Sequence, residues 1–240
     1  MPDSLTIPAR FNGPPGSANG GYTCGLLAGM LEAEVAEVSL RAPPPLECPL
    51  EIVRAARQLE LRDGETLVAT ATPAELELDA PAPVSPADAR AASKAGLEEW
   101  TARHPFPTCV VCGPDRDPRD GMRLFPGPLG DGRYAAEWTP DGSLGAGRDP
   151  VPPECVWAAL DCPTSAPVAD FGERPPVVLA RLSARLDHPV VVGEPHAIVS
   201  WPLEVDGRKR HAAAALFDVE GRLLCASRAL WIELRPRSGR

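Results

Sequence analysis

The sequence predicts an α+β protein made of two related units, each with antiparallel strands around one short central helix. Proline accounts for 30 of the 240 residues, against a usual share of about 5%. Because proline disrupts helix interiors, a mostly helical fold is disfavoured. Alternating apolar and polar residues, as in residues 178–186, indicate strands with one buried face. Similar patterns recur in the two halves of the chain, which is typical of a repeated unit.

Matching residues in the two halves lie at a nearly constant spacing. The spacing is larger for Gly64 and its counterpart Gly221, so the second half carries extra residues before that match. These fall near residues 205–217, where Asp206-Gly207 is typical of a hairpin turn and predicts a longer hairpin. The other matched pairs are Leu40 with Leu186, Pro43 with Pro189, and Pro49 with Pro195.

This pattern divides the chain into three parts. We expect a first unit over residues 1–78, a connector over residues 79–103 and a second unit over residues 104–240. Each unit has one short predicted helix, at roughly residues 21–34 and 152–161. A sheet with one apolar face must be covered, and a helix wrapped by the sheet covers it.

The connector carries a clear helix start. Ser85 is a good N-cap, and Pro86 is favoured in a first helical turn. The pattern that follows predicts a helix from about Pro86 to Ala102.

Charge and composition exclude several classes of protein. The net charge is −9 and the isoelectric point is about 5.0, which disfavours nucleic-acid binding because such domains are usually basic. No apolar run approaches the roughly 18 residues of a membrane span, and the first residues do not resemble a secretion signal. The seven cysteines are an odd number set mostly among apolar residues, which favours a reducing compartment. We therefore expect a cytoplasmic protein without nucleic-acid or membrane partners.

Several motifs resemble one known family. Residues 109–127, CVVCGPDRDPRDGMRLFPG, resemble the Cys-Phe-x-Cys-Gly … Asn-Pro-x-Gly-Leu opening of many small hotdog thioesterases. Residues 151–169 resemble their His-Gly-Gly-Val-x-x-x-Leu-Leu-Asp helix segment, and residues 19–31 resemble it again, with Asn19 at the His position. In this order the motifs resemble the fused, double-hotdog acyl-CoA thioesterases. The resemblance implies a double hotdog, with antiparallel sheets that each wrap a central helix.

The resemblance also implies one composite site between the halves. In the family, one unit supplies backbone amides from a Gly-Gly loop and the other supplies a carboxylate. The first unit keeps Asn19, Gly20 and Gly21 but has Ala28 where the acid would stand. The second unit has Asp161 but replaces the His-Gly-Gly loop with residues 152–154, Pro-Pro-Glu. Complementary losses of this kind fit a covalent pseudo-dimer that keeps one site.

Thioester hydrolysis needs stabilisation of a carbonyl oxygen that becomes negative. Amides of Gly20 and Gly21 at a helix N-terminus are suited to this oxyanion role, and Asp161 to the role of general base or nucleophile. Each also has a structural interpretation, as turn glycines before a helix and as a helix-end residue. The residues expected to bind substrate are Asn19, Tyr22, Trp157, Thr164, Ser165, Arg208 and Arg210. The two arginines are equally typical of a solvated surface.

Cys109 and Cys112 have the spacing of a zinc-binding pair. One pair is a weak signal, because closed zinc sites need four ligands and the only nearby partners in sequence are His104, Cys155 and Cys162. We expect structural thiols, with no metal and no cofactor other than the CoA thioester as substrate.

The predicted function is hydrolysis of small-molecule acyl thioesters of CoA or of a carrier, by a chain that forms a possible homodimer of double hotdogs. A non-catalytic binder of acyl thioesters on the same fold is the main alternative. A hotdog hydratase or dehydratase is a weaker one, because its acid is followed about five residues later by His, where this chain has Ala166.

Overall fold

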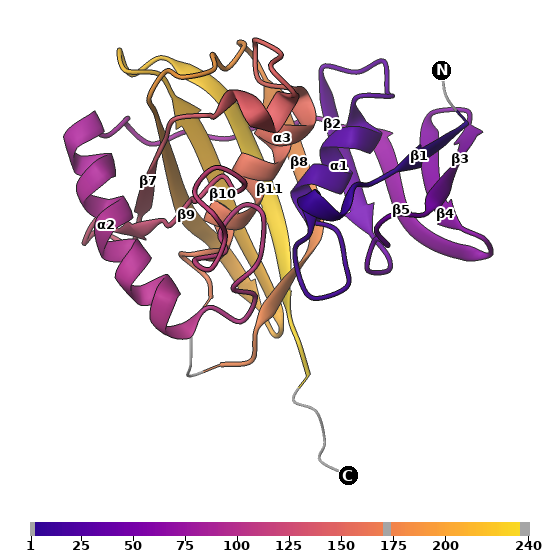
Figure 1. Ribbon diagram of the computed structural model, residues 1–240, viewed down its shortest axis with the longest axis horizontal. Helices are drawn as coiled ribbons and strands as arrows, with labels where there is room; N and C mark the ends of the chain where they lie inside the picture. Colours follow the sequence, from indigo (N-terminus) through magenta and orange to yellow (C-terminus); the bar gives the residue numbers. More distant parts are fainter. Residues whose placement is uncertain (1–2, 170–173, 236–240) are drawn as a thin grey trace.

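A computed structural model describes residues 3–169 and 174–235 (Figure 1). Its described strands form one antiparallel sheet of 11 strands, in the order β1-β3-β4-β5-β2-β8-β11-β10-β9-β7-β6. The first half of the chain contributes β1 (Ser4–Thr6), β2 (Val35–Leu40), β3 (Pro49–Ala55), β4 (Gln58–Asp63) and β5 (Thr66–Pro73). The second half contributes β6 (Gly127–Pro128), β7 (Tyr134–Trp138), β8 (Val177–Leu186), β9 (His196–Asp206), β10 (Lys209–Phe217) and β11 (Leu223–Glu233).

The two halves of the sheet have the same strand order. Read from the outside inwards, the first half runs β1-β3-β4-β5-β2, and the second runs β7-β9-β10-β11-β8 behind the short edge strand β6. The halves join where β2 pairs with β8, with Val38 opposite Leu182. The predicted α+β class is therefore confirmed, in the form of two sheet halves of equal topology joined edge to edge.

One helix from each half lies at the joint. These are α1 (Gly20–Ala28) and α3 (Pro153–Asp161), which pack against each other and against β8 (Figure 1). Their approach is close because α1 has glycines at the contact. A Cβ on Gly21 would lie 2.4 Å from Cβ of Asp161, and one on Gly25 would lie 2.6 Å from Cα of Glu154.

The first predicted helix was too long at its C-terminal end. The pattern suggested a helix to residue 34, but α1 stops at Ala28. Gly29 is the C-cap, and its backbone N–H donates to the carbonyl groups of Gly25 and Leu27. Residues 29–34, which the pattern had placed in the helix, instead link α1 to β2.

The helix α2 (Pro86–Arg103) covers the outer strands β6 and β7. It matches the helix predicted in the connector, and the Ser85 hydroxyl accepts from the backbone N–H of Asp88 as an N-cap. Trp100 anchors its last turn, because the indole N–H donates to the carbonyl of Pro126 at 3.2 Å. The predicted hairpin turn also forms, between β9 and β10, with Gly207 at a φ of 56°.

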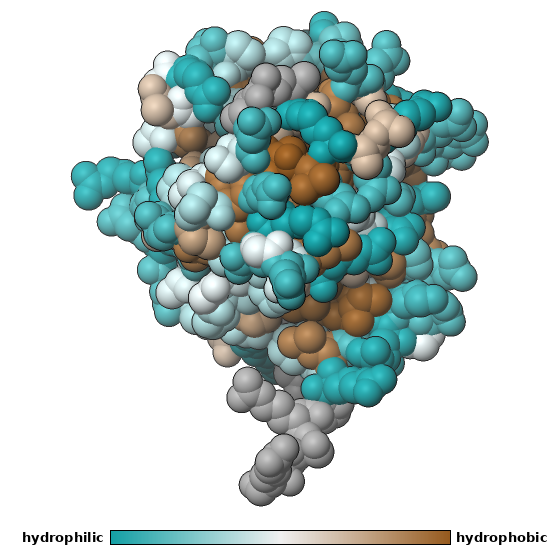
Figure 2. Space-filling model, turned by 90° about the vertical axis from the view of Figure 1, so that its right-hand side faces the viewer, coloured by the Kyte–Doolittle hydropathy of each residue, from teal (hydrophilic) through white to brown (hydrophobic). Residues whose placement is uncertain are grey.

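Short 3-10 helices complete the described chain: η1 (Ala9–Phe11), η2 (Gly142–Gly145) and η3 (Cys162–Ser165). None of the described helices is long and apolar enough to cross a bilayer. At the end of the molecule formed by the first half of the sheet, hydrophobic residues reach the surface in separate patches among hydrophilic ones (Figure 2).

Candidate active site

Asp161 is the last residue of α3, and its carboxylate crosses the joint to the start of α1. Oδ2 accepts hydrogen bonds from the backbone N–H of Gly21 at 2.9 Å and from Nδ2 of Asn19 at 3.1 Å. The residue is only 1% exposed. Burial raises the pKa of Asp161 to about 7, although the hydrogen bonds from Gly21 and Asn19 favour the charged form. The structure thus brings together three of the residues that the sequence singled out.

The second carboxylate oxygen of Asp161 lacks a hydrogen-bond donor among the described residues. This atom, Oδ1, is buried. A buried acceptor without a partner is costly, so such an atom is usually satisfied by water or a ligand. Because Asp161 lines a cavity of about 650 Å³, a molecule in that cavity can supply the missing donor.

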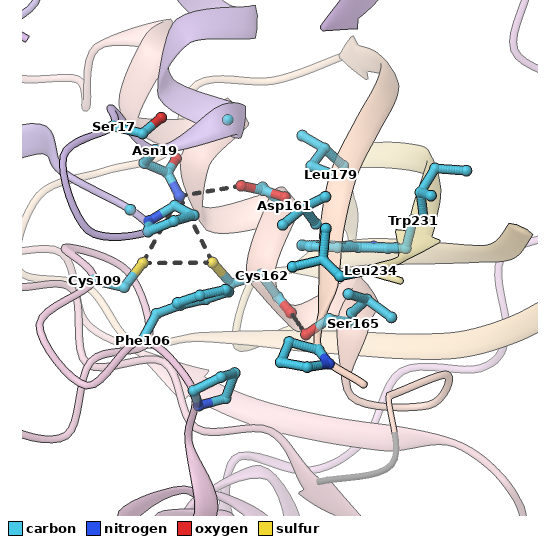
Figure 3. A pocket seen from close by; sticks show the side chains of 18 of the residues that line it. Ser17, Asn19, Phe106, Cys109, Asp161, Cys162, Ser165, Leu179, Trp231 and Leu234 are labelled. Carbon is cyan, nitrogen blue, oxygen red and sulfur yellow. Dashed lines mark hydrogen bonds between the residues drawn. The ribbon is translucent and has the colours of Figure 1, made fainter. Parts of the chain in front are cut away.

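This cavity lies beside the joint between the halves (Figure 3). Pockets for small molecules are mostly apolar with a few polar groups that fix orientation, and this one follows that pattern. Asn19, Gly20, Asp161 and Ser165 contribute its polar groups. Its apolar wall includes Leu40, Phe106, Val178, Leu179, Trp231 and Leu234.

The side chain of Asn19 both caps α1 and donates a hydrogen bond to the carboxylate of Asp161. Its Oδ1 accepts from the backbone N–H of Tyr22 at 2.8 Å, which caps the helix. Its Nδ2 donates to Asp161 and also lies 3.9 Å from Sγ of Cys109 and 3.7 Å from Sγ of Cys162 (Figure 3). The amide orientation is therefore fixed from both ends.

The two glycines differ in position. Gly21 donates its N–H to Asp161 and does not line the cavity. Gly20 does line it, and no described residue accepts a hydrogen bond from its N–H. A Cβ on Gly20 would lie 2.9 Å from Cδ2 of Leu179, so a larger residue here would push against the apolar wall of the cavity.

Most of the other residues expected to bind substrate lie elsewhere. Ser165 is at the cavity wall, where its hydroxyl donates to the carbonyl of Cys162 at 2.8 Å. Thr164 is fully buried behind the wall, between the indole N–H of Trp231 and the carbonyl of Asp161. Trp157 packs in the core against Gly25.

Tyr22, Arg208 and Arg210 do not line the cavity either. The ring of Tyr22 stacks on Phe11 with centroids 3.8 Å apart. Burial also raises the pKa of Tyr22 well above its usual value. Arg210 is 5% exposed and pairs with Glu233, so it is a structural ion pair and not the solvated or phosphate-binding group that was expected. Arg208 donates to the carbonyl of Glu233 at 2.8 Å.

Three arginines at the cavity escaped the sequence analysis: Arg41, Arg103 and Arg174. They come from the end of β2, the end of α2 and the segment before β8. Because these segments meet only in the folded chain, no local pattern in the sequence marks them.

Three cysteines form a cluster next to Asp161. The Sγ atoms of Cys109, Cys112 and Cys162 all lie within 4.8 Å of one another, and all three residues line the cavity. Hydrogen bonds from the other two thiols hold the pKa of Cys109 well below its usual value. Nε2 of His104 lies 3.2 Å from Sγ of Cys112, and burial lowers the pKa of His104 to about 4.

Comparison with known proteins gives structural but no sequence matches. No protein-family model matches the chain, and neither does any curated protein. A thioesterase II from Thermobifida fusca described as putative superposes with a TM-score of 0.61 at 17% identity, covering 97% of this chain and 92% of that one. A protein of unknown function from Alicyclobacillus acidocaldarius, described as having the hotdog fold, has a TM-score of 0.61 at 13% identity, covering 97% and 93%.

The chain has the hotdog fold. Since the likeness covers nearly the whole chain and the two sheet halves share one topology, it is a double hotdog. An acyl-CoA thioesterase II from Mycobacterium marinum is similar at a TM-score of 0.54 and 13% identity, over 93% of this chain and 92% of that one. In the hotdog fold of this chain, α1 and α3 are the two central helices, and the cavity lies beside their contact.

Proposed function

We propose that this hotdog protein hydrolyses acyl thioesters at the composite site formed by α1 and α3. One observation carries the proposal: Asp161 of α3 is held by Gly21 and Asn19 of α1 at the wall of a largely apolar cavity. A buried carboxylate with one oxygen fixed and the other unpaired is suited to accept a proton from a water molecule.

In this mechanism the two oxygens of Asp161 have different tasks. Oδ2 is anchored by Gly21 and Asn19. In one route Oδ1 takes a proton from the water that attacks the thioester carbonyl, and the C–S bond then breaks as the thiolate leaves and takes up that proton. In the other route Oδ1 attacks the carbonyl itself, the thiolate leaves, and water hydrolyses the resulting acyl anhydride. The N–H of Gly20, at the positive end of the α1 dipole, stabilises the developing oxyanion. The N–H of Gly21 is occupied by the carboxylate, so we assign the oxyanion role to Gly20 and an anchoring role to Gly21.

The rest of the cavity suits an acyl thioester. Leu179, Trp231 and Leu234 offer apolar surface to an acyl chain or to the pantetheine arm of a carrier. Arg41, Arg103 and Arg174 place positive charge at the same cavity, which suits the phosphates of CoA or of a carrier protein. Thioesterases among the similar solved structures agree with this choice of substrate class.

The test is thioester cleavage by the purified chain. A panel of acyl-CoA esters of increasing chain length is followed by thiol release, and Asp161→Asn is expected to lower kcat by about 100-fold or more. Asp187→Asn, which changes an exposed carboxylate paired with Arg185, is the matched control and should retain full activity. Absence of cleavage across the panel, or full activity in a folded Asp161→Asn variant, would contradict the proposal.

A non-catalytic binder is the second candidate. It is favoured by the loss of the glycine loop at α3, where the N-cap is Pro152 and makes no side-chain capping bond. In that case the chain would bind a non-hydrolysable acyl-CoA thioether in a saturable way, measured by calorimetry. Asp161→Asn would then change the affinity for the thioether, and neither the wild-type chain nor the variant would cleave thioesters.

A further inference from the structure

The cysteine cluster is built from two separate parts of the chain. Cys109 and Cys112 lie in the loop that follows α2, and Cys162 begins η3 directly after Asp161. All three cysteines are buried, with exposed fractions of 3% for Cys109, 4% for Cys112 and 6% for Cys162. The Sγ atoms of Cys109 and Cys162 are 3.9 Å apart, far beyond the roughly 2.05 Å of a disulfide.

These sulfur positions fit tetrahedral metal coordination. Bonds of about 2.3 Å from a zinc ion to thiolates place neighbouring sulfurs about 3.8 Å apart. The 3.9 Å separation of Cys109 and Cys162 matches this edge, and Cys112 completes a triangle within 4.8 Å. Thiolate sets of this kind select soft or borderline metals such as zinc over magnesium or calcium.

Hydrogen-bond donors surround the sulfurs. The ring of His104 is oriented by the backbone N–H of Phe106, which donates to Nδ1 at 2.8 Å. A neutral ring with Nδ1 as acceptor carries its proton on Nε2, so His104 donates to Sγ of Cys112 at 3.2 Å. Nδ2 of Asn19 faces the other two sulfurs (Figure 3). Donors outside a metal site stabilise thiolate charge and orient the ligands.

We propose that Cys109, Cys112 and Cys162 bind one zinc ion as thiolates. Binding displaces the protons of the three thiols to solvent. All three cysteines line the cavity, so the fourth coordination place opens into it and takes a water molecule or a ligand there. His104 is a positioning residue for Cys112, since its Nδ1 accepts from the Phe106 amide and its Nε2 keeps the proton that it donates to Cys112. The sequence analysis expected no metal because a single cysteine pair is a weak signal; the fold adds Cys162 to that pair as a third sulfur.

The first experiment measures metal, and it is independent of any enzymatic activity. Protein from cells grown with added zinc is expected to contain about one zinc per chain by elemental analysis, and Cys112→Ser and Cys162→Ser should lose it. Cys48→Ser, a half-buried cysteine outside the cluster, should keep it. A wild-type chain that stays metal-free after reconstitution, that carries iron instead, or that shows a Cys109–Cys162 disulfide by mass spectrometry would overturn the proposal.

A second measurement does not depend on the folding of the variants. Cobalt added to the metal-free wild-type chain should give thiolate-to-metal charge-transfer bands and the visible bands of tetrahedral coordination, and zinc should abolish them. Absence of these bands overturns the site. In competition with a chelator, His104→Ala should lower zinc affinity by about 10–100-fold, while His188→Ala, on an exposed residue, should not. Equal affinity in His104→Ala would overturn the positioning role.

Discussion

Gly21 is one of the residues at which the two halves approach closely. Its missing side chain lets the Asp161 carboxylate reach the backbone N–H at 2.9 Å, and a Cβ there would also lie 2.8 Å from the carbonyl oxygen of Trp157. Neither neighbour is the end of a flexible side chain. The glycine is therefore needed for the contact between α1 and α3, besides any catalytic consequence.

We predict that Gly21→Ala destabilises the protein by about 1–3 kcal/mol, because α3 must shift to make room for the methyl group. Gly29→Ala, at the exposed end of the same helix, is the matched control. The closest atom to its new Cβ is 3.4 Å away, so its free energy of unfolding should change by less than about 0.5 kcal/mol. Urea denaturation followed by tryptophan fluorescence measures both; equal effects of the two variants would argue against the close contact.

At the scale of single elements, α2 combines an N-cap with a narrow buried face, formed by Ala89, Ala92, Gly96 and Trp100. Its first turn is exposed, and the Ser85 hydroxyl accepts from the Asp88 N–H at 3.1 Å. The helix packs through small residues: a Cβ on Gly96 would lie 2.3 Å from the carbonyl oxygen of Phe125. The cap and the small residues of this face together let α2 cover β6 and β7.

Ser85→Ala should lower the free energy of unfolding by about 1 kcal/mol, since it leaves the Asp88 N–H without its cap. Ser85→Thr keeps a hydroxyl that can accept from the Asp88 N–H and donate to the Asp88 carboxylate, as Ser85 does at 2.7 Å, and is expected to retain most of the stability. Thermal unfolding of the three proteins decides the matter. If alanine and threonine gave the same loss, the cap would not be the cause.

Across the whole molecule, burial lowers the pKa of two histidines, His104 and His196, and so makes stability depend on pH. His196 begins β9 opposite Trp138 and is 4% exposed. Burial lowers the pKa of His196, although the charges of Glu194 and Asp218 act in the other direction. Above pH of about 6.5 the ring is neutral in both the folded and unfolded chain, so its contribution is fully present. Below that value the unfolded chain takes up a proton that the folded chain resists, and stability is lost.

The fall in the urea midpoint between about pH 7.5 and about pH 5 should therefore be smaller in His196→Phe than in the wild-type chain. The buried Asp161 carboxyl, with its raised pKa, shifts stability in the opposite sense and is present in both proteins. The comparison thus isolates His196. A variant with the same pH dependence as the wild type would show that this ring is not the titrating group.

Local signals predicted the elements with short-range causes. Ser85-Pro86 marked the start of α2, and Asp206-Gly207 marked the β9–β10 turn, because caps and turns are set by adjacent residues. The end of α1 was missed, since the apolar residues after Gly29 fit a longer helix as well as a link to β2.

The candidate site was predictable only in part, for the same reason. Asn19 and Asp161 were found through motifs, and the structure brings them together. Arg210 was misjudged because its partner, Glu233, lies on a neighbouring strand whose register the sequence does not reveal. The closeness of Cys109 to Cys162 likewise comes from packing and not from spacing.

Because β2 pairs with β8, the inner edge strand of each half is fully paired. The edge strands of the whole sheet are therefore β1 and β6. These outer strands are three and two residues long; β6 ends in Pro128, and α2 packs over it. Edge strands that are short, contain proline or are covered by a helix offer another chain few free backbone groups for pairing. Growth of the sheet by addition of strands from further copies is thereby discouraged, so any self-association is expected to proceed through side chains on the broad faces.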